Sequence, residues 1–307
     1  MWNENRFMQE KENAIYLKLF LMSMFWGGTF VATKVASHYV TAFQGGFLRF
    51  SIASIGLIAV FYFSKQTFPK WSLESFLITA LMSFFGIIAY NYFFFNALSY
   101  LAPSRASLLV SLNPIIILFL SALFYGEKIT SIKIIGVLIS LFGAVIVISK
   151  GNVMNIFSGF GRGELLALGC PTTWAIYTLL SRKLSTIQTP LFTTMMASIL
   201  GAIGLLPLAQ NDGLYFSSLP LSAWYSLVYL ALAGTVLGFV WYAEGIKKIG
   251  MVKTSIFNNL VPVFGVLLSF LVLGEEITWS VLIGGLFVVS GVAMINFGHL
   301  FFEKKEA

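Results

Sequence analysis

The sequence predicts an all-α polytopic membrane protein with ten transmembrane helices, arranged as two inverted five-helix repeats. Three observations lead to this fold class: the composition, a series of long apolar runs, and an internal repeat. Of the 307 residues, 58% are hydrophobic and only 10% are charged, whereas soluble domains average about 25% charged residues. With a mean hydropathy of +0.88, the chain cannot cover a water-facing surface. A soluble enzyme, a disordered chain and a fibrous protein are therefore excluded.

Ten apolar runs are long enough to cross a bilayer, which takes roughly 20 mainly apolar residues. They lie at about 16–36, 44–64, 73–96, 104–125, 131–149, 164–182, 191–210, 222–245, 253–273 and 279–299. The first run has full span length, so no cleaved signal peptide is expected. The predicted organisation is a tail (1–15), a first repeat (16–150), a linker loop (151–163), a second repeat (164–299) and a tail (300–307).

The basic residues orient these spans. If the N-terminus is cytoplasmic, fourteen of the 19 lysines and arginines fall on the inner side. The five that fall on the outer side are Lys34, Arg49, Arg105, Lys150 and Arg162. This is a strong positive-inside bias, so both termini are predicted to be cytoplasmic. The net charge of +7 is then mostly topogenic, and no nucleic-acid partner is expected.

The chain aligns with itself at an offset of 148 residues. Leu112–Gly143 pairs with Leu260–Gly291 without a gap, and 13 of 32 positions are identical. Shared apolar residues mean little in this composition, but shared Pro, Glu and Gly residues mean more, as in Pro114/Pro262, Gly126/Gly274 and Glu127/Glu275. Because each copy holds five spans, the second copy must enter the membrane from the opposite side. Inverted repeats of this kind recur in transporters, where the two halves rock around a site near the midplane.

Specific motifs make this sequence similar to a known family. The run Phe25–Lys34, the segment Ser104–Leu109 and the doubled Pro…Gly-Glu…Ile-Thr element at Pro114–Thr130 and Pro262–Thr278 resemble the EamA-like family of the drug/metabolite transporter superfamily. The resemblance covers about Leu17 to Phe297. It implies ten helices around a central cavity, cytoplasmic termini, and export of small organic solutes such as amino acids. Asn113 departs from the pattern, because a glutamate is frequent there among relatives.

The doubled Gly-Glu turn has a structural explanation. Gly126 and Gly274 suit the left-handed position after a helix, and Thr130 and Thr278 suit the N-cap of the next one. Pro114 and Pro262 lie mid-span, where each removes a backbone hydrogen bond, so both are candidate hinges. Polar residues share a helix face with each proline, namely Ser107 and Ser111 in the first half and Ser255 and Asn259 in the second. These stripes line a cavity or, alternatively, hold packed helices together.

Aromatic and hydroxyl residues recur at the same offset. Trp26, Thr29, Phe30 and Lys34 correspond to Trp174, Tyr177, Thr178 and Arg182. Rings beside hydroxyls suit a solute that is partly apolar and partly polar, although interfacial aromatics are common in membrane proteins. The predicted substrate-binding set is Trp26, Thr29, Phe30, Lys34, Arg49, Asn91, Ser107, Ser111, Trp174, Tyr177, Trp241, Tyr242 and Asn259.

Ionisable residues inside the apolar part of the membrane are costly, so each one is a candidate for a functional role. Arg49 and Arg105 are candidates near outer span ends, where snorkelling is the alternative. A carboxylate proton relay has one plausible site, Glu244, or none, and an ion pair with Lys247 or Lys248 is the slightly favoured explanation of Glu244. Cations without nearby acids in the outer half favour a solute that carries a carboxylate or phosphate.

These features predict a secondary transporter of a small organic metabolite, an amino acid or derivative, working in the efflux direction in a bacterial cytoplasmic membrane. Alternatives are an exchanger or importer of a nucleotide-like metabolite, a multidrug exporter, and a structural or sensing membrane protein. No catalytic residue, cofactor or metal site is expected, because the single cysteine and two histidines supply too few ligands and no catalytic motif occurs. The partners are a solute and the lipid bilayer. The oligomeric state is left open.

Overall fold

The computed structural model describes residues 2–69, 71–126, 129–151, 160–184, 187–213, 216–249, 254 and 257–302, and none of these is in a β-strand. The first half contains α1 (Trp2–Ala36), α2 (Ala42–Phe63), α3 (Leu73–Ser83), η1 (Phe84–Ala89), α4 (Tyr90–Tyr100), α5 (Pro103–Val110), α6 (Asn113–Tyr125) and α7 (Ser131–Ile148). The second contains α9 (Arg162–Leu184), α10 (Pro190–Asn211), η3 (Phe216–Ser218), α11 (Leu221–Tyr229), η4 (Leu230–Leu237), α12 (Gly238–Ile249), α14 (Val261–Leu273) and α15 (Trp279–Phe302).

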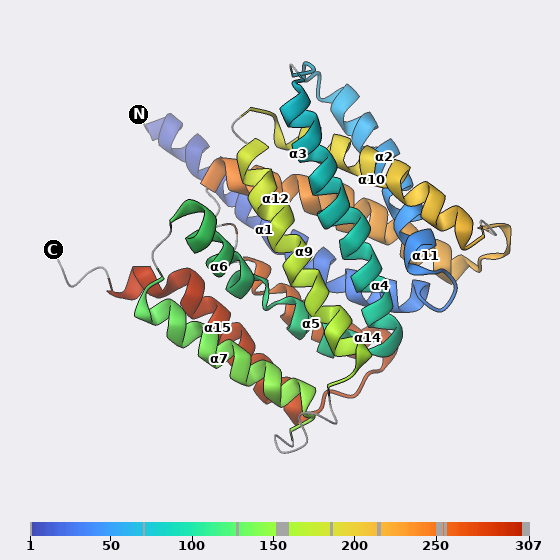
Figure 1. The fold of residues 1–307 in the computed structure, drawn as a ribbon. Helices are drawn as coiled ribbons and strands as arrows, with labels where there is room; N and C mark the ends of the chain where they lie inside the picture. Colours follow the sequence, from blue (N-terminus) through green and yellow to red (C-terminus); the bar gives the residue numbers. More distant parts are fainter. Residues whose placement is uncertain are drawn as a thin grey trace.

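Seven helical stretches in the described residues are long and apolar enough to cross a membrane, and shorter apolar helices occur at Val261–Leu273 and Trp279–Ile295. The predicted span 164–182 lies within α9, which is helical throughout but is not among the seven. Residues predicted as an N-terminal tail are helical from Trp2. In Figure 1, α1 begins and α15 ends toward the same end of the bundle.

The helix bounds repeat along the chain at the offset found in the sequence. α2 and α10 span equivalent residues, and so do α6 and α14. The short π-helices η1 and η4 also occupy corresponding places, each inserted into a longer apolar helix. A π-helix carries an extra residue per turn and frequently marks a functional site. The two halves thus share their irregular features as well as their regular helices.

The two prolines lie at breaks rather than at kinks within a continuous helix, which corrects the expectation from sequence. α5 ends at Val110 and α6 begins at Asn113, so Pro114 lies in the first turn of a new helix. In the same way, Pro262 lies in the first turn of α14. Proline is tolerated there because the first-turn N–H groups have no partner inside the helix. The breaks leave polar backbone and side chains exposed to the space between the halves.

The predicted helix-ending glycines are confirmed: Gly126 and Gly274 both have a φ of 65°. Thr130 occupies the N-cap position of α7 without a side-chain cap, whereas the Thr278 hydroxyl accepts from the Val281 N–H at 3.4 Å. Glu275 accepts hydrogen bonds from the hydroxyls of Ser104 on α5 and Ser269 on α14, so it joins the two halves. Glu127 lies outside the described residues.

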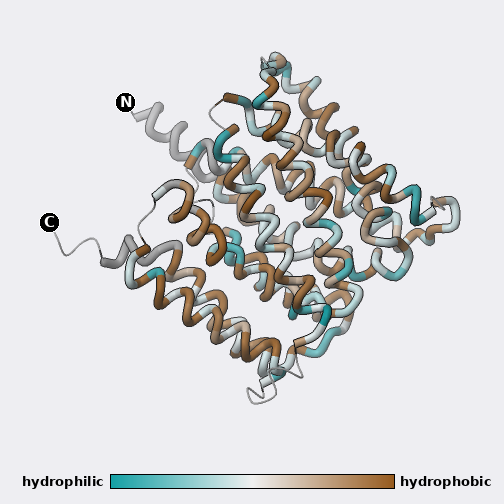
Figure 2. The backbone as a smooth tube through the Cα atoms, viewed as in Figure 1, coloured by the Kyte–Doolittle hydropathy of each residue, from teal (hydrophilic) through white to brown (hydrophobic). Residues whose placement is uncertain are grey.

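Helices α7 and α15 pack side by side at one edge of the bundle (Figure 1). Small residues bring their backbones together: a Cβ on Gly136 would meet the Gly291 carbonyl at 2.7 Å, and one on Gly143 would meet the Gly284 carbonyl at 2.5 Å. Packing within the chain therefore explains these glycines. Outward-facing side chains of α7, such as Leu138 and Phe142, are exposed, and Figure 2 shows hydrophobic residues over both helices. This surface suits contact with lipid.

Candidate functional site

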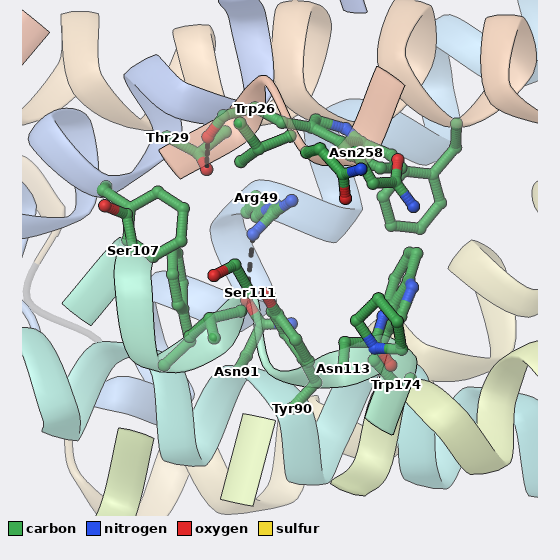
Figure 3. Close-up of a pocket in the computed structure, with 18 of the residues that line it drawn as sticks. Trp26, Thr29, Arg49, Tyr90, Asn91, Ser107, Ser111, Asn113, Trp174 and Asn258 are labelled. Carbon is green, nitrogen blue, oxygen red and sulfur yellow. Dashed lines mark hydrogen bonds between the residues drawn. The ribbon is translucent and has the colours of Figure 1, made fainter. Parts of the chain in front are cut away.

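A cavity lies between the two halves, at the level of the helix breaks. It contains about 800 Å³ of space between atoms, including the part open to the surroundings. Its lining comes from both halves (Figure 3) and consists of Trp26, Thr29, Phe30, Arg49, Phe50, Gly86, Tyr90, Asn91, Phe94, Ser107, Val110, Ser111, Asn113, Pro114, Trp174, Phe239, Asn258, Asn259 and Val261. We call it the central cavity.

Arg49 on α2 is the charged residue of this lining, and its side chain is held by one residue from each half. Its Nε donates to the Thr235 hydroxyl at 3.0 Å, and its Nη1 donates to Asn91 Oδ1 at 3.4 Å (Figure 3). Both partners are tied to a π-helix in turn. Asn91 donates to the Ile87 carbonyl of η1 at 2.7 Å, and Thr235 donates to the Leu230 carbonyl of η4 at 3.0 Å. The guanidinium is thereby fixed in orientation at the cavity wall.

The charge of Arg49 has no carboxylate partner within the described parts of the chain. Other cations have one: Lys18 pairs with Glu244 at 2.8 Å, Arg105 with Glu164 at 2.9 Å and Lys183 with Glu74 at 2.6 Å. Arg49 is only 4% exposed, and an unpaired charge is costly in so buried a place. The arrangement therefore favours an anionic group in the cavity.

The helix breaks add further polar groups to the same wall. The side-chain carbonyl oxygens of Asn113, Asn258 and Asn259 are buried and have no hydrogen-bond partner in the described part of the chain, and Figure 3 shows the first two beside the cavity. The N-termini of α6 and α14, at Asn113 and Val261, also line it. The N-terminus of a helix carries partial positive charge, and broken membrane helices use it to bind anionic groups of substrates.

Five aromatic side chains cluster where the central cavity adjoins a second cavity: Trp26, Trp174, Tyr177, Phe239 and Tyr242. We call them the aromatic partition. Trp174 lies at its centre, with ring centroids 5.6 Å from Trp26, 5.3 Å from Phe239 and 4.9 Å from Tyr177. The second cavity contains about 700 Å³ of space, including the part open to the surroundings, and shares Trp174 and Phe239 with the first. These rings offer apolar faces to a solute on either side.

Comparison with known proteins identifies the family. The sequence profile described as the EamA-like transporter family matches twice, at residues 13–149 and 161–297. The chain belongs to the EamA-like transporter family. Together with its apolar helices, this makes it an integral multi-pass membrane protein.

Relatives of this EamA-like transporter are themselves named as transporters. It is 29% identical over 281 residues to the "Uncharacterized transporter YyaM" of Bacillus subtilis, covering 91% of this chain and 92% of that protein. It is 26% identical over 217 residues to the "Probable terminal-alkyne amino-acid exporter" of Streptantibioticus cattleyicolor, covering 71% and 72%. A solved crystal structure that is 22% identical has the same fold, with a TM-score of 0.68 over 96% of this chain and 99% of that one.

The structure gathers most of the predicted substrate-binding residues of this EamA-like transporter at the central cavity. They are Trp26, Thr29, Phe30, Arg49, Asn91, Ser107, Ser111, Trp174 and Asn259, with the candidate hinge Pro114. Tyr177 and Tyr242 line the second cavity instead. Lys34 donates to the Leu98 carbonyl at 2.7 Å, and Trp241 packs against Phe25 with ring centroids 5.8 Å apart. Three predicted residues line neither cavity: Lys34, Trp241 and Pro262.

Glu244 lines neither cavity, and its recorded ion pair is with Lys18 on α1. Sequence reasoning had placed its partner three or four residues further along the same helix. Arg105, a candidate functional residue with snorkelling as the alternative, pairs with Glu164 and donates to the Ile148 carbonyl at 3.0 Å. Both carboxylates therefore have structural partners. Within the described residues, no group of three or more His, Cys, Asp or Glu side chains could hold a metal ion.

Several lining residues were not predicted, above all Tyr90, Asn113 and Asn258. Asn113 was noted only as a departure from the family pattern, and Asn258 was not named as a site residue. A signal for both existed: an amide side chain close before a mid-span proline lies where the helix can break. Tyr90 had no such signal, because one tyrosine in the aromatic run Tyr90–Phe95 looks like any other.

Proposed function

We propose that this protein is a secondary transporter that exports a small metabolite bearing a carboxylate, an amino acid or derivative, across a bacterial cytoplasmic membrane. The solute binds in the central cavity with its carboxylate at Arg49 and its apolar part against the aromatic partition. The observation that carries the proposal is a buried arginine that has no carboxylate partner among the described residues and faces a cavity that two helix N-termini also face. A carboxylate fits the fork of a guanidinium by two parallel hydrogen bonds.

Movement across the membrane occurs by alternating access of two inverted five-helix repeats, with ten spans in all. The contacts between α7 and α15 support this arrangement. Gly136 and Gly284 are equivalent in the repeat, and so are Gly143 and Gly291. Gly136 meets Gly291 while Gly143 meets Gly284. Reciprocal contacts of this kind are the mark of a two-fold relation. The double match of the family profile supports the duplication. The breaks before Pro114 and Pro262 serve as hinges.

The orientation follows from the distribution of the basic residues, which places both termini in the cytoplasm. The described ends of α1 and α15 lie toward the same end of the bundle, in agreement with this orientation (Figure 1). The solute class has separate support from the relative named an amino-acid exporter. Since its identity to this chain is only 26%, that name suggests the class of solute and not a particular one.

Two alternative solutes remain compatible with parts of the site. A nucleotide-like metabolite would place a phosphate at Arg49, but the charge of one arginine would balance only part of the negative charge of a phosphate chain. A cationic drug would use the aromatic partition, but it would meet the buried charge of Arg49 with the same sign. Both therefore fit less well than a single carboxylate. An intramembrane enzyme and a structural or sensing protein find no specific support in the cavity lining.

Counterflow in proteoliposomes tests the proposal, with labelled amino acids, one nucleotide and one organic cation as probes. We expect saturable exchange of an amino acid, reduced about 10- to 100-fold by Arg49→Gln, because a hydrogen bond to a charged group contributes about 1.5–3 kcal/mol. Arg49→Lys should keep part of the activity, since it keeps the charge but not the fork.

Lys183→Gln is the matched control, because it removes a cation that is 57% exposed and lines neither cavity. We expect it to leave exchange unchanged. Exchange of the organic cation alone, or equal exchange of amino acids by the wild type and Arg49→Gln, would overturn the assignment of the carboxylate to Arg49.

A further inference from the structure

The second cavity has a polar lining of its own at the end of the bundle formed by the C-terminal part of α9, the start of α10 and α12. Its walls include the hydroxyls of Thr178, Ser181, Thr193 and Thr194. Thr178 donates to the Trp174 carbonyl at 2.8 Å, and Thr193 donates to Gln188 Oε1 at 3.2 Å. Ser181 and Thr194 make no side-chain hydrogen bond within the described residues, although Thr194 is only 4% exposed. Two hydroxyls therefore remain available to a molecule in this cavity.

Aromatic side chains line the second cavity together with these hydroxyls. They are Tyr177, Phe239 and Tyr242 of the aromatic partition, and the exposed Arg182 also belongs to the lining. The cavity thus combines the features of the central one: aromatic rings, small polar groups and a guanidinium. A compartment that served only as a water-filled exit would not require both rings and hydroxyls in its lining.

In the first half, side chains occupy the space that corresponds to the second cavity. The repeated fold alone therefore does not produce this cavity. The positions of Thr193 and Ala243 are taken there by Gly45 and Phe95. A Cβ on Gly45 would lie 2.3 Å from the Phe95 ring, and Phe95 is 1% exposed. The residues that leave the second cavity open are thus particular to the second half.

We propose that the second cavity is a second binding site for the solute, occupied on the cytoplasmic side of the aromatic partition. It takes an amphiphilic carboxylate whose apolar part packs on Tyr177 and Phe239 and whose polar groups bond to Ser181 and Thr194, with its carboxylate toward Arg182. The solute occupies this site before it passes the partition to Arg49. The inference rests on the proposed function, because it assumes that the same solute occupies the central cavity.

Equilibrium dialysis of radiolabelled L-phenylalanine against the purified full-length protein tests the second site, with Arg49→Gln and Thr194→Val as the informative variants. We expect two molecules bound per chain in the wild type. Arg49→Gln should remove or weaken one of them, and Thr194→Val should weaken the other about tenfold, since it removes a hydrogen bond with little change of shape. Ser198→Ala on the same helix is the control, because its hydroxyl is buried outside both cavities.

Ser181→Ala provides a second probe of the same site, in case Thr194→Val disturbs folding. One bound molecule, lost in Arg49→Gln and unaffected by Thr194→Val and Ser181→Ala, would overturn the second site and leave the proposed function standing. Binding that depends on Ser181 and Thr194 but not on Arg49 would support the second site and contradict the proposed function. Absence of binding in folded wild-type protein would overturn both for this class of solute.

Discussion

Two places that the internal repeat makes equivalent are packed in opposite ways. Around Lys34, the Phe30 and Phe94 rings meet with centroids 5.0 Å apart, and Phe95 lies against Gly45. Around Arg182, the positions of Gly45 and Phe95 are held by Thr193 and Ala243, and the second cavity occupies the space. We call these places the Lys34 end and the Arg182 end. Equivalent helices are thus closely packed at the Lys34 end and enclose a cavity at the Arg182 end.

The two ends differ in their side chains rather than in the helices that carry them. Gly45 and Phe95 are one pair of such residues, and Phe30, whose equivalent is Thr178, is another difference. Glycine at position 45 lets a large ring approach the backbone of α2 closely, and phenylalanine at position 95 supplies that ring. Threonine and alanine in the other half reverse the two sizes, so no ring fills the gap. Dense packing makes such a place either filled or open, with little in between. We therefore expect this pair to influence which end of the transporter is closed.

The largest expected effect comes from Gly45→Thr, which introduces at the Lys34 end the residue type that Thr193 supplies at the Arg182 end. A Cβ at position 45 would overlap the Phe95 ring, and Phe95 is only 1% exposed. Overpacking a buried position costs about 1–3 kcal/mol or more. We therefore expect a lower Tm in thermal unfolding of the purified protein and at least about tenfold slower counterflow.

Adding Phe95→Ala to Gly45→Thr should restore folding, because the double variant reproduces the Thr193/Ala243 pair. It should also open the Lys34 end. Thr33→Cys, introduced into this background, should then react with a membrane-impermeant maleimide, while Cys170 is fully buried and adds no background. A double variant no more stable than Gly45→Thr alone would show that the pair does not control the packing.

A smaller effect is expected from Thr33→Val at the Lys34 end. The Thr33 hydroxyl is fully buried and has no hydrogen-bond partner among the residues that the structure describes, whereas its equivalent, Ser181, lines the second cavity. Replacing an unsatisfied buried hydroxyl by a methyl group of the same shape should stabilise the sealed state by about 1 kcal/mol, measured as a higher Tm. Thr79→Val is the control, because Thr79 is equally buried but donates to the Ser75 carbonyl at 2.8 Å. A gain in Thr79→Val as large as in Thr33→Val would argue against this explanation.

The sequence was sufficient to predict the helical fold, because hydrophobic length and helix-ending residues are local properties. Gly126 and Gly274 adopt the left-handed conformation that their place in the doubled motif predicted. The repeat offset also predicted which helices would match, since α2 and α10 have equivalent bounds. The break before Pro114 was mistaken for a kink because the sequence alone does not indicate whether neighbouring helices leave room for a separated turn.

The sequence predicted most residues of the site but not how they divide between the two cavities. Trp174 and Tyr177 were grouped because they lie near each other along one helix, yet Trp174 lines both cavities and Tyr177 only the second. That separation depends on Phe239, which comes from a distant helix and whose equivalent in the first half is Asn91. The partners of Arg49 were likewise hidden, because the π-helix η4 that presents Thr235 has no recognised sequence signature.

The smallest effect is expected at Glu244, whose equivalent in the first half is Asn96. Glu244 pairs with Lys18, and both side chains are about one-third exposed, at 33% and 37%. Exposed ion pairs contribute at most about 1 kcal/mol. We therefore expect Glu244→Gln to change counterflow by no more than about twofold and to leave its dependence on pH unchanged. Lys18→Gln is the matched variant, since it removes the other partner and should behave alike. If exchange driven by a pH gradient is lost in Glu244→Gln but not in Lys18→Gln, the Glu244 carboxylate is instead the proton-coupling group. The two ends would then differ in a functional ionisable residue as well as in packing, because the equivalent of Glu244 is Asn96.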